Sequence, residues 1–368
     1  MRIGIMLRTI DDRQGIGVYV GNLMDHLLPL DAKNEYVLFY KDAKSSRRYA
    51  ERYPNVTEVV LPAPHKALWD QVVIPLAARR HKLDVIFHPK FTLPFFTTRK
   101  TVMTIHGASW FVHPELYPKL GIAYIRAFMP LYCRKADLIL SNSDLTTDDF
   151  VRILHVPREK IRTIELGTNS QYKPIDDQAA LARIKQQYQL PDKFILSVIR
   201  HDPRKNFENL IAAFRLLRKK TACKLVVTGL GCEKYRAEYA LDEDGTAADV
   251  VFTGWVEQTD LPCMYSLARC MFFPSVYEEF GIPACEAMAC GCPPVVSKTG
   301  ALPGIVRDAG LIVDQFAPPE MAAALYRIYT DDALRAELAT RSLARSRDFT
   351  WERCARQTLD AINGLGCA

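Results

Sequence analysis

The sequence predicts an α/β protein built from two doubly wound parallel sheets. Short apolar runs alternate with helical patterns along the chain, and this alternation is typical of parallel strands joined by right-handed helical crossovers. About a dozen such runs fall into two sets, and a chain of 368 residues is long enough for two domains. Turn-forming residues interrupt the pattern between 166 and 174. We therefore expect two Rossmann-like domains that face each other across a cleft.

The strands are expected at the apolar runs, and helices are expected between them. In the first half the runs lie at 2–7, 36–40, 56–61, 84–88, 101–106 and 138–141. In the second half they lie at 194–199, 223–229, 250–254, 270–274, 294–297 and 310–313. The clearest helical patterns are at 17–28, 120–135 and 319–330. We place the domains at 1–170 and 171–345, followed by a C-terminal helix within 346–368.

Composition narrows the class of protein. With 49% hydrophobic and 24% charged residues the chain can build ordinary cores, and no run of 18 apolar residues predicts a transmembrane helix. The first seven residues are expected to form a core strand rather than a signal peptide. The ten cysteines lack the paired spacing of zinc sites, and those inside apolar runs indicate reduced thiols of a cytoplasmic protein.

The formal net charge of +6 is concentrated in the first half of the chain. Residues 1–172 carry 24 lysines and arginines against 17 acidic residues, whereas the remainder carries one net negative charge. The excess includes Arg47, Arg48, Arg79 and Arg80. It could be an ordinary solvated surface, or it could attract an anionic acceptor or an anionic membrane to which the protein binds peripherally. No basic and aromatic recognition motif accompanies it, so nucleic acid is not an expected partner.

The segment 275–296 carries the most specific signal for a ligand. Its pattern is a strand end, a loop, a helix that Pro283 opens, and a stop at Gly291. The N-terminus of this helix offers unpaired N–H groups and the positive end of the helix dipole, which attract phosphate. Glu278 and Glu286 flank it, and carboxylates accept hydrogen bonds from vicinal hydroxyls. An anion site between two carboxylates suits a nucleotide-sugar, which carries a diphosphate and hydroxyls.

Two cations follow the strand expected at 194–199. Arg200 and Lys205 would lie at the carboxyl end of a parallel strand, where ligands of such sheets bind. Fixed cations there stabilise the negative charge that develops on the β-phosphate of a departing nucleoside diphosphate. No Asp-x-Asp motif that would hold a divalent cation follows in a corresponding loop, so we expect no metal and no other cofactor. The neighbouring Asp202 and Arg204 are expected to be surface residues.

These residues resemble the E-x7-E signature of the family-4 retaining glycosyltransferases, which have the GT-B fold. The spacing of Glu278 and Glu286 fits this signature, and so does the Phe-Gly-Ile-Pro sequence between them. Arg200 and Lys205 are similar to the basic pair of that family, and His106 is similar to a histidine of its N-terminal domain. The resemblance covers nearly the whole chain. It implies that the C-terminal helix packs back on the first domain.

The resemblance also implies a role for each of these residues. His106, Arg200, Lys205 and Glu278 would form the catalytic centre, in which Glu278 contacts the donor sugar and the two cations bind the diphosphate. Glu286, expected in the first turn of its helix, would accept both ribose hydroxyls. Further residues would bind the donor, mostly through backbone N–H groups and with Val256 beside the base: Gly15, Gly17, Val256, Phe280, Gly281 and Ile282.

The main hypothesis is a retaining hexosyltransferase of cell-surface polysaccharide synthesis. It would move a hexose, mannose from GDP-mannose being favoured over a UDP-sugar, to a sugar or lipid-linked glycan acceptor. A sugar-nucleotide 2-epimerase and a non-catalytic nucleotide-sugar binding protein stay open as alternatives. A dinucleotide oxidoreductase does not fit, because Gly15 and Gly17 are followed by Gly21 and the dinucleotide fingerprint is G-x-G-x-x-G. The aromatic loops 91–96 and 110–112 could line an acceptor groove, touch a membrane or pack in the core.

Overall fold

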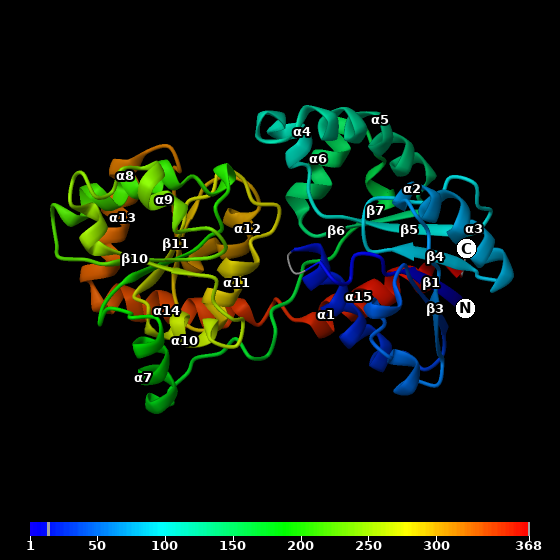
Figure 1. The fold of residues 1–368 in the computed structure, drawn as a ribbon, viewed down its shortest axis with the longest axis horizontal. Coiled ribbons are helices and arrows are strands. Elements are labelled where there is room, and N and C mark those ends of the chain that lie inside the picture. The colour runs from blue at the N-terminus through cyan, green and yellow to red at the C-terminus, as the bar shows by residue number, and fades with distance from the viewer. Residues whose placement is uncertain (13–14, 367–368) are drawn as a thin grey trace. The chain divides into compact units, whose positions relative to one another are not determined.

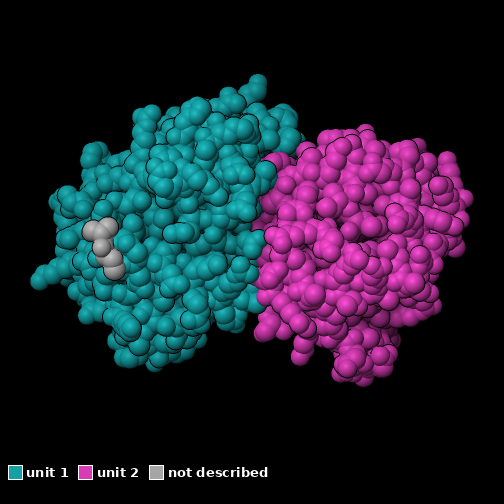
Figure 2. Space-filling view, turned by 180° about the vertical axis from the view of Figure 1, so that it is seen from behind, with its two compact units in different colours: residues 1–167, 350–368 teal, residues 168–349 magenta. Residues whose placement is uncertain are grey.

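The computed structural model describes residues 1–12 and 15–366, which form two compact units (Figures 1 and 2). One unit consists of residues 1–167 together with 350–368, and the other consists of residues 168–349. Each unit contains one sheet in which every strand pairs in parallel with its neighbours. No helix within the described residues is long and apolar enough to cross a bilayer.

The first unit has a seven-stranded sheet in the order β3-β2-β1-β4-β5-β6-β7. Its strands are β1 (Arg2–Met6), β2 (Glu35–Tyr40), β3 (Val56–Val60), β4 (Val85–His88), β5 (Lys100–Ile105), β6 (Leu138–Ser141) and β7 (Ile161–Thr163). The central strands β1 and β4 are buried along almost their whole length, because helices cover both faces of the sheet. The strand order reverses between β1 and β4, and ligands of open α/β sheets bind beside such a switch point.

Helices cover this sheet in two layers (Figure 1). One layer holds α2 (Lys66–Leu68), a π-helical stretch (Trp69–Val73), α3 (Ile74–Arg80), α4 (Ser109–Val112), α5 (Lys119–Lys135) and α6 (Asp144–Leu154). The other layer holds α1 (Ile16–Leu27) and α15 (Trp351–Asn363), which pack on each other. Trp351 is almost fully buried, and its ring lies 6.2 Å from that of Tyr19, so the end of the chain belongs to the core of the first unit.

The second unit has a six-stranded sheet in the order β10-β9-β8-β11-β12-β13. Its strands are β8 (Ile195–Val198), β9 (Leu225–Thr228), β10 (Val250–Gly254), β11 (Cys270–Phe273), β12 (Pro294–Ser297) and β13 (Leu311–Val313). Its helices are α7 (Gln178–Gln187), α8 (Phe207–Arg218), α9 (Lys234–Glu238), α10 (Leu261–Leu267), α11 (Ile282–Ala289), α12 (Leu302–Val306), α13 (Pro318–Thr330) and α14 (Asp332–Ser346). Here the strand order reverses between β8 and β11, so the loops after these two strands meet at the switch point.

The predicted α/β class with two doubly wound sheets is confirmed. Each of the twelve predicted strands is present, with ends within two residues of the prediction. A thirteenth strand, β7, was not predicted, because this edge strand of three residues carries the polar Arg162 and Thr163 and lacks a continuous apolar run. The three predicted helices correspond to α1, α5 and α13.

Candidate functional site

The predicted donor residues of the second unit converge on its switch point. Arg200 and Lys205 follow β8, and Glu278 follows β11, the strand next to β8 in the sheet. Residues that lie 73 positions apart in the sequence therefore come into contact: the Nζ of Lys205 lies 2.6 Å from Oε1 of Glu278. These two side chains were expected to have separate partners, a diphosphate and a sugar, and the structure shows them as one ion pair.

The Lys205–Glu278 pair is shielded from solvent. The exposed fractions are 15% for the lysine side chain and 14% for the glutamate side chain, so the pair is screened less than a surface ion pair. The ammonium group also lies 4.8 Å from the ring centroid of Phe273, the last residue of β11. A ligand phosphate that reached Lys205 would find its cation already oriented.

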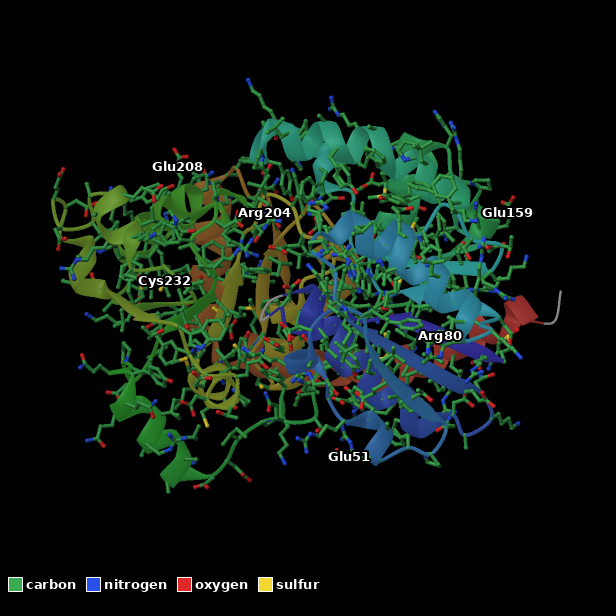
Figure 3. All side chains as sticks on the ribbon, turned by 45° about the vertical axis from the view of Figure 1, so that its right-hand side comes forward. Glu51, Arg80, Glu159, Arg204, Glu208 and Cys232 are labelled. Carbon is green, nitrogen blue, oxygen red and sulfur yellow. The ribbon has the colours of Figure 1, made fainter. Side chains whose placement is uncertain are left out.

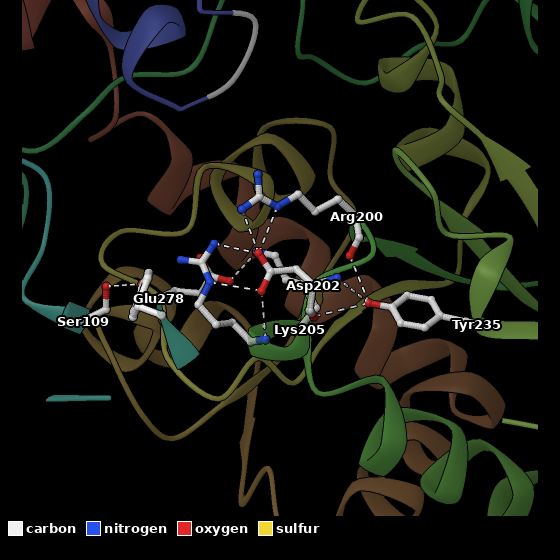
Figure 4. A network of polar contacts seen from close by, with 8 residues as sticks. Ser109, Arg200, Asp202, Lys205, Tyr235 and Glu278 are labelled. Atoms are coloured by element: carbon white, nitrogen blue, oxygen red, sulfur yellow. Dashed lines mark hydrogen bonds and ion pairs between the residues drawn. The ribbon is translucent and has the colours of Figure 1, made fainter. Parts of the chain in front are cut away.

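Asp202 organises the two arginines of the same loop (Figure 4). Nε and Nη2 of Arg200 donate to its Oδ2 at 3.1 and 2.7 Å, and Nη2 of Arg204 donates to Oδ2 at 2.8 Å. Hydrogen bonds from Arg204 and Arg200 outweigh the effect of burial and hold the pKa of Asp202 well below its usual range. The expectation that Asp202 and Arg204 are surface residues is therefore wrong, since 13% of the aspartate side chain and 21% of the arginine side chain are exposed.

Hydrogen bonds with Tyr235 hold the backbone of the loop that carries Arg200 and Asp202. Its hydroxyl donates to the carbonyl oxygen of Arg200 at 3.0 Å and accepts from the backbone N–H of Asp202 at 3.0 Å. Its ring stacks on Phe207, the first residue of α8, at a centroid distance of 4.0 Å. The loop that carries the cations is thus held in place by these contacts, and preorganised charge stabilisation requires such fixed cations.

The loop that carries Glu278 is held from two sides. The backbone N–H of Val276 donates to the carbonyl oxygen of Arg204 at 2.9 Å, which ties this loop to the cationic loop. On the other side, the N–H of Ala301 donates to the carbonyl oxygen of Glu278 at 2.8 Å. Gly300 has a φ of +68°, and a Cβ there would lie 2.5 Å from that carbonyl oxygen. Gly300 was not predicted to belong to the site, although a glycine soon after a buried strand often marks a close backbone approach.

The N-terminus of α11 has the geometry of an anion site. Gly281 precedes the helix with a φ of +101°, and a Cβ there would lie 2.5 Å from Cδ2 of Leu302. No backbone hydrogen bond within the described residues uses the N–H of Phe280, Gly281 or Ile282, and Pro283 has no N–H. The Phe280 ring is buried against Phe349. The three N–H groups thus have no backbone partner among the described residues, and the helix dipole would favour an anion beside them.

Glu286 lies in the second turn of α11, because the helix begins at Ile282; the expectation of the first turn is wrong. The hydroxyl of Tyr265 donates to its Oε2 at 3.2 Å. Burial raises the pKa of Glu286 to about 7, against the opposing effect of the hydroxyls of Tyr172 and Tyr265. Among the described residues the buried hydroxyl of Tyr172 has no partner of standard hydrogen-bond geometry. Neither tyrosine was identified from the sequence, since both lie outside the motif.

Val256, the predicted base contact, follows β10 after a turn at Gly254, whose φ is +69°. The residue is buried, and the contact of its backbone with a base stays a prediction. The ring of Trp255 is 48% exposed, and its Nε1 donates to Oε1 of Glu257 at 3.3 Å. An exposed aromatic ring beside this backbone suits a stacked base.

His106, in the first unit, follows β5. Its Nε2 donates to the carbonyl oxygen of Pro89 at 3.0 Å, and burial lowers the pKa of the imidazole to about 4. The ring is therefore neutral at physiological pH, with its proton on Nε2 and a lone pair on Nδ1. Such a histidine can accept a hydrogen bond from a sugar hydroxyl but does not supply positive charge.

Gly15 and Gly17 lie in different structural environments, and only one of them is required by close packing of the chain. Gly15 lies at the start of α1 with a φ of +43°, and a Cβ there would meet nothing within 4 Å. At Gly17 a Cβ would lie 1.8 Å from the carbonyl oxygen of Asp12, so the chain itself needs this glycine. The predicted donor role of both glycines stays a prediction.

A polar cluster that the sequence analysis did not identify lies near His106. Arg8, after β1, donates from Nε and Nη2 to the two carboxylate oxygens of Asp70, both at 3.0 Å. Asp70 lies in the π-helical stretch, and such stretches often occur at functional sites. Lys90, after β4, is half-buried, and burial together with the Arg8 charge lowers its pKa. The cluster marks the switch point of the first sheet, and Lys90 is a cation that an anionic acceptor could use.

The aromatic loops mostly pack in the core. Phe91, Phe95, Trp110 and Phe111 contact the cluster of buried residues around β5 and α5, and Trp110 stacks on Tyr117 at 4.5 Å. Phe96 differs, because 77% of the residue is exposed.

The described residues contain no group of three His, Cys, Asp or Glu side chains that could hold a metal ion.

Two family models match the chain. The model described as Glycosyl transferases group 1 matches residues 181–345, and the model described as Glycosyltransferase Family 4 matches residues 13–172. The O-antigen chain mannosyltransferase B of Escherichia coli is 32% identical over 95% of this chain and 96% of that protein. The chain belongs to the group 1 glycosyltransferases.

This glycosyltransferase is also similar to a second curated protein and to a solved structure. The serotype-specific mannosyltransferase WbdA of Escherichia coli is 28% identical over 72% of this chain, which is 34% of that protein. The structure of sucrose-phosphate synthase from Thermosynechococcus elongatus superposes with a TM-score of 0.78 at 21% identity, covering 100% of this chain and 99% of that one. This likeness shows the fold, and the predicted GT-B class is confirmed.

Proposed function

We propose that this glycosyltransferase moves mannose from GDP-mannose to a hydroxyl of a sugar or lipid-linked glycan during synthesis of a cell-surface polysaccharide. The observation that carries the proposal is the 32% identity, over nearly the whole of both chains, to a protein named as an O-antigen chain mannosyltransferase. The partial match to a second mannosyltransferase supports the same sugar. The reaction would take place in the cytoplasm, at the inner face of the membrane.

The donor is proposed to bind in the second unit. Arg200 and Lys205 would hold the diphosphate together with the free N–H groups before α11. Glu278, fixed by Lys205, would accept hydrogen bonds from hydroxyls of the sugar, and Glu286 would accept them from the ribose. The first unit would bind the acceptor and contribute His106, whose Nδ1 lone pair can accept a hydrogen bond from a donor-sugar hydroxyl.

The transfer is proposed to retain the anomeric configuration of the donor. Glu278, the carboxylate predicted to contact the sugar, is held in an ion pair with Lys205, which makes it a poor nucleophile. We therefore favour attack of the acceptor hydroxyl on the same face from which the diphosphate leaves. The C1–O bond to the β-phosphate breaks, the C1–O bond to the acceptor forms, and the acceptor proton passes to the departing phosphate oxygen. The protein supplies positioning and charge stabilisation.

A donor screen tests the proposed function. The protein would be incubated with GDP-mannose, UDP-glucose or UDP-N-acetylglucosamine, each with and without a mannoside acceptor, and release of nucleoside diphosphate would be measured. We expect acceptor-dependent release from GDP-mannose that is at least tenfold faster than from either UDP-sugar. Consumption of a donor without acceptor would instead support the epimerase, and binding without turnover of any donor would support the non-catalytic alternative.

A further inference from the structure

Exposed apolar side chains gather on one layer of the first unit. Among the described residues fifteen large hydrophobic side chains are exposed, and eight of them lie on α2–α3, on α5 or in the loop between β4 and β5. These eight are Leu68, Val72, Leu76, Phe96, Leu120, Tyr124, Phe128 and Leu131. Such a concentration on one side of a protein marks an interaction surface rather than the scattered exposure that is normal.

Helix α5 is apolar on two opposite sides. Its inner side, with Ile125 and Met129, is buried in the core of the unit. Its outer side presents Leu120, Tyr124, Phe128 and Leu131 at intervals of four, four and three residues, which places them in one stripe. Leu120 is 87% exposed, and the rings of Tyr124 and Phe128 stack on each other at 4.9 Å.

A second stripe runs beside the first. Leu68, Val72 and Leu76 are spaced by four residues along 66–80, in the same helical layer as α5 (Figure 1). Phe95 links the two stripes: its backbone N–H donates to Oε1 of Gln71 at 2.9 Å, and its ring stacks on Tyr132 of α5 at 4.9 Å. We call the two stripes together with Phe96 the outer helix face.

The charges around the outer helix face are almost all positive. Its exposed cations are Lys66, Arg79, Arg80, Lys119, Arg126 and Arg134, of which Arg80 is labelled at the end of α3 in Figure 3. The only carboxylate within 66–80 and 119–135 is that of Asp70, which is buried and paired with Arg8. Exposed acids close to these segments along the chain include Glu115, which precedes α5 and pairs with His113, and Asp144 and Asp148 on α6.

The arginines nearer the N-terminus differ from these cations. Arg47 pairs with Asp11 at 3.1 Å, and Arg48 pairs with Glu51 at 3.7 Å, so both charges are offset by neighbouring acids. Part of the charge excess predicted from the sequence therefore lies on the outer helix face, together with the apolar stripes.

We propose that the outer helix face docks on an anionic lipid bilayer. Leucine, valine and aromatic side chains would enter the boundary between headgroups and acyl chains, and the six cations would attract anionic headgroups. A symmetric pair of protein copies is a poorer occupant, because it would bring the same six cations against one another. The proposal concerns where the enzyme works and does not depend on which sugar it transfers.

Vesicle flotation tests the docking surface. The intact protein would be mixed with vesicles of phosphatidylcholine alone or with 30% phosphatidylglycerol, and the floated fraction would be measured. We expect flotation with the anionic vesicles, and we expect it to weaken as salt rises because screening shortens the reach of the cations. The variants Leu120→Ser/Phe128→Ser and Arg126→Glu/Arg134→Glu should each bind the anionic vesicles at least tenfold more weakly.

A matched control separates docking from general effects of substitution. Val60→Ser/Tyr326→Ser changes two apolar side chains of about 40% exposure that lie outside the outer helix face, and it should float as the wild type does. Melting temperatures within a few degrees of wild type would show that the variants fold. If the folded wild type ignores anionic vesicles, or if the two test variants float unchanged, the proposal is wrong. A wild-type dimer that Leu120→Ser/Phe128→Ser dissociates, without vesicle binding, would assign the face to self-association.

Discussion

Glu286 is half-protonated near neutral pH in the unliganded protein, because burial raises its pKa to about 7. Only the ionised carboxylate can accept both ribose hydroxyls, so binding of a nucleoside diphosphate should release a proton from this site. We expect the affinity for GDP to fall about tenfold from pH 8 to pH 6, beyond the effect of the phosphate's own titration. Titration calorimetry at three pH values measures it, and Glu286→Gln supplies the control, since it should keep only the phosphate effect. An identical slope in both proteins would remove Glu286 from the nucleotide site.

The Lys205–Glu278 pair predicts a second pattern. Lys205→Ala should lower kcat/KM at least about tenfold, because a charge-assisted hydrogen bond contributes about 1.5–3 kcal/mol. Glu278→Ala should impair transfer while GDP affinity stays near that of wild type, because the lysine remains available to the phosphate. In the double variant the losses of kcat/KM from the two substitutions should not add, since each substitution removes one partner of the same contact. Additive losses, or a loss of GDP affinity in Glu278→Ala, would mean that the two side chains act separately.

At the scale of elements, two glycines shape the loops around the site. Gly300→Ala places a Cβ 2.5 Å from the carbonyl oxygen of Glu278, a backbone atom that cannot move aside, and the residue also needs a positive φ. We expect it to cost about 1–3 kcal/mol in stability and to weaken donor binding. Gly281→Ala meets only a movable leucine side chain, but its φ of +101° is strained for any residue with a Cβ, so it should also be destabilising. Gly304→Ala, in α12 with nothing within 4 Å, is the matched control for melting temperature and GDP affinity. Equal melting temperatures for all three variants would contradict this reading of the loops.

The elements also show what sequence patterns can and cannot predict. Buried parallel strands such as β8 and β11 are continuous apolar runs, so their positions could be predicted. The loops that carry Arg200 and Glu278 could be predicted with them, because they follow these strands directly. The start of α11 lies one residue before Pro283, because a proline marks the first turn without fixing the first residue, and Glu286 therefore falls just beyond the first turn. Asp202 was misread because only the folded loop brings its carboxylate between two guanidinium groups. Tyr265 reaches Glu286 from another helix, a contact that no local pattern encodes.

At the scale of the whole molecule, the two sheets follow from the alternation of strands and helices, and this part of the prediction needed no side-chain detail. The sites at the two switch points follow from strand order together with the residues after β8 and β11 and after β1, β4 and β5. The sequence alone does not predict which cations form ion pairs with acidic residues. That depends on pairs such as Arg47 with Asp11, which form only in the folded unit.

Metal independence is an expectation for the enzyme as a whole. If Arg200 and Lys205 stabilise the leaving diphosphate, turnover of GDP-mannose should persist in excess EDTA at close to the untreated rate. Lys205→Ala serves as the comparison, and added magnesium should not restore its activity. Loss of wild-type turnover on chelation, with recovery on adding magnesium or manganese, would show that the diphosphate is bound by a metal instead.

The most direct measurement of the central claim is the anomeric configuration of the product. GDP-α-mannose and a mannoside acceptor would be incubated with the protein, and the new glycosidic bond would be assigned by its one-bond carbon–hydrogen coupling in NMR spectra. We predict one α-mannosidic bond for each GDP released, and neither in the absence of acceptor. A β-mannosidic product would contradict front-face transfer, and GDP release without any new mannoside would contradict the proposed mannosyltransferase itself.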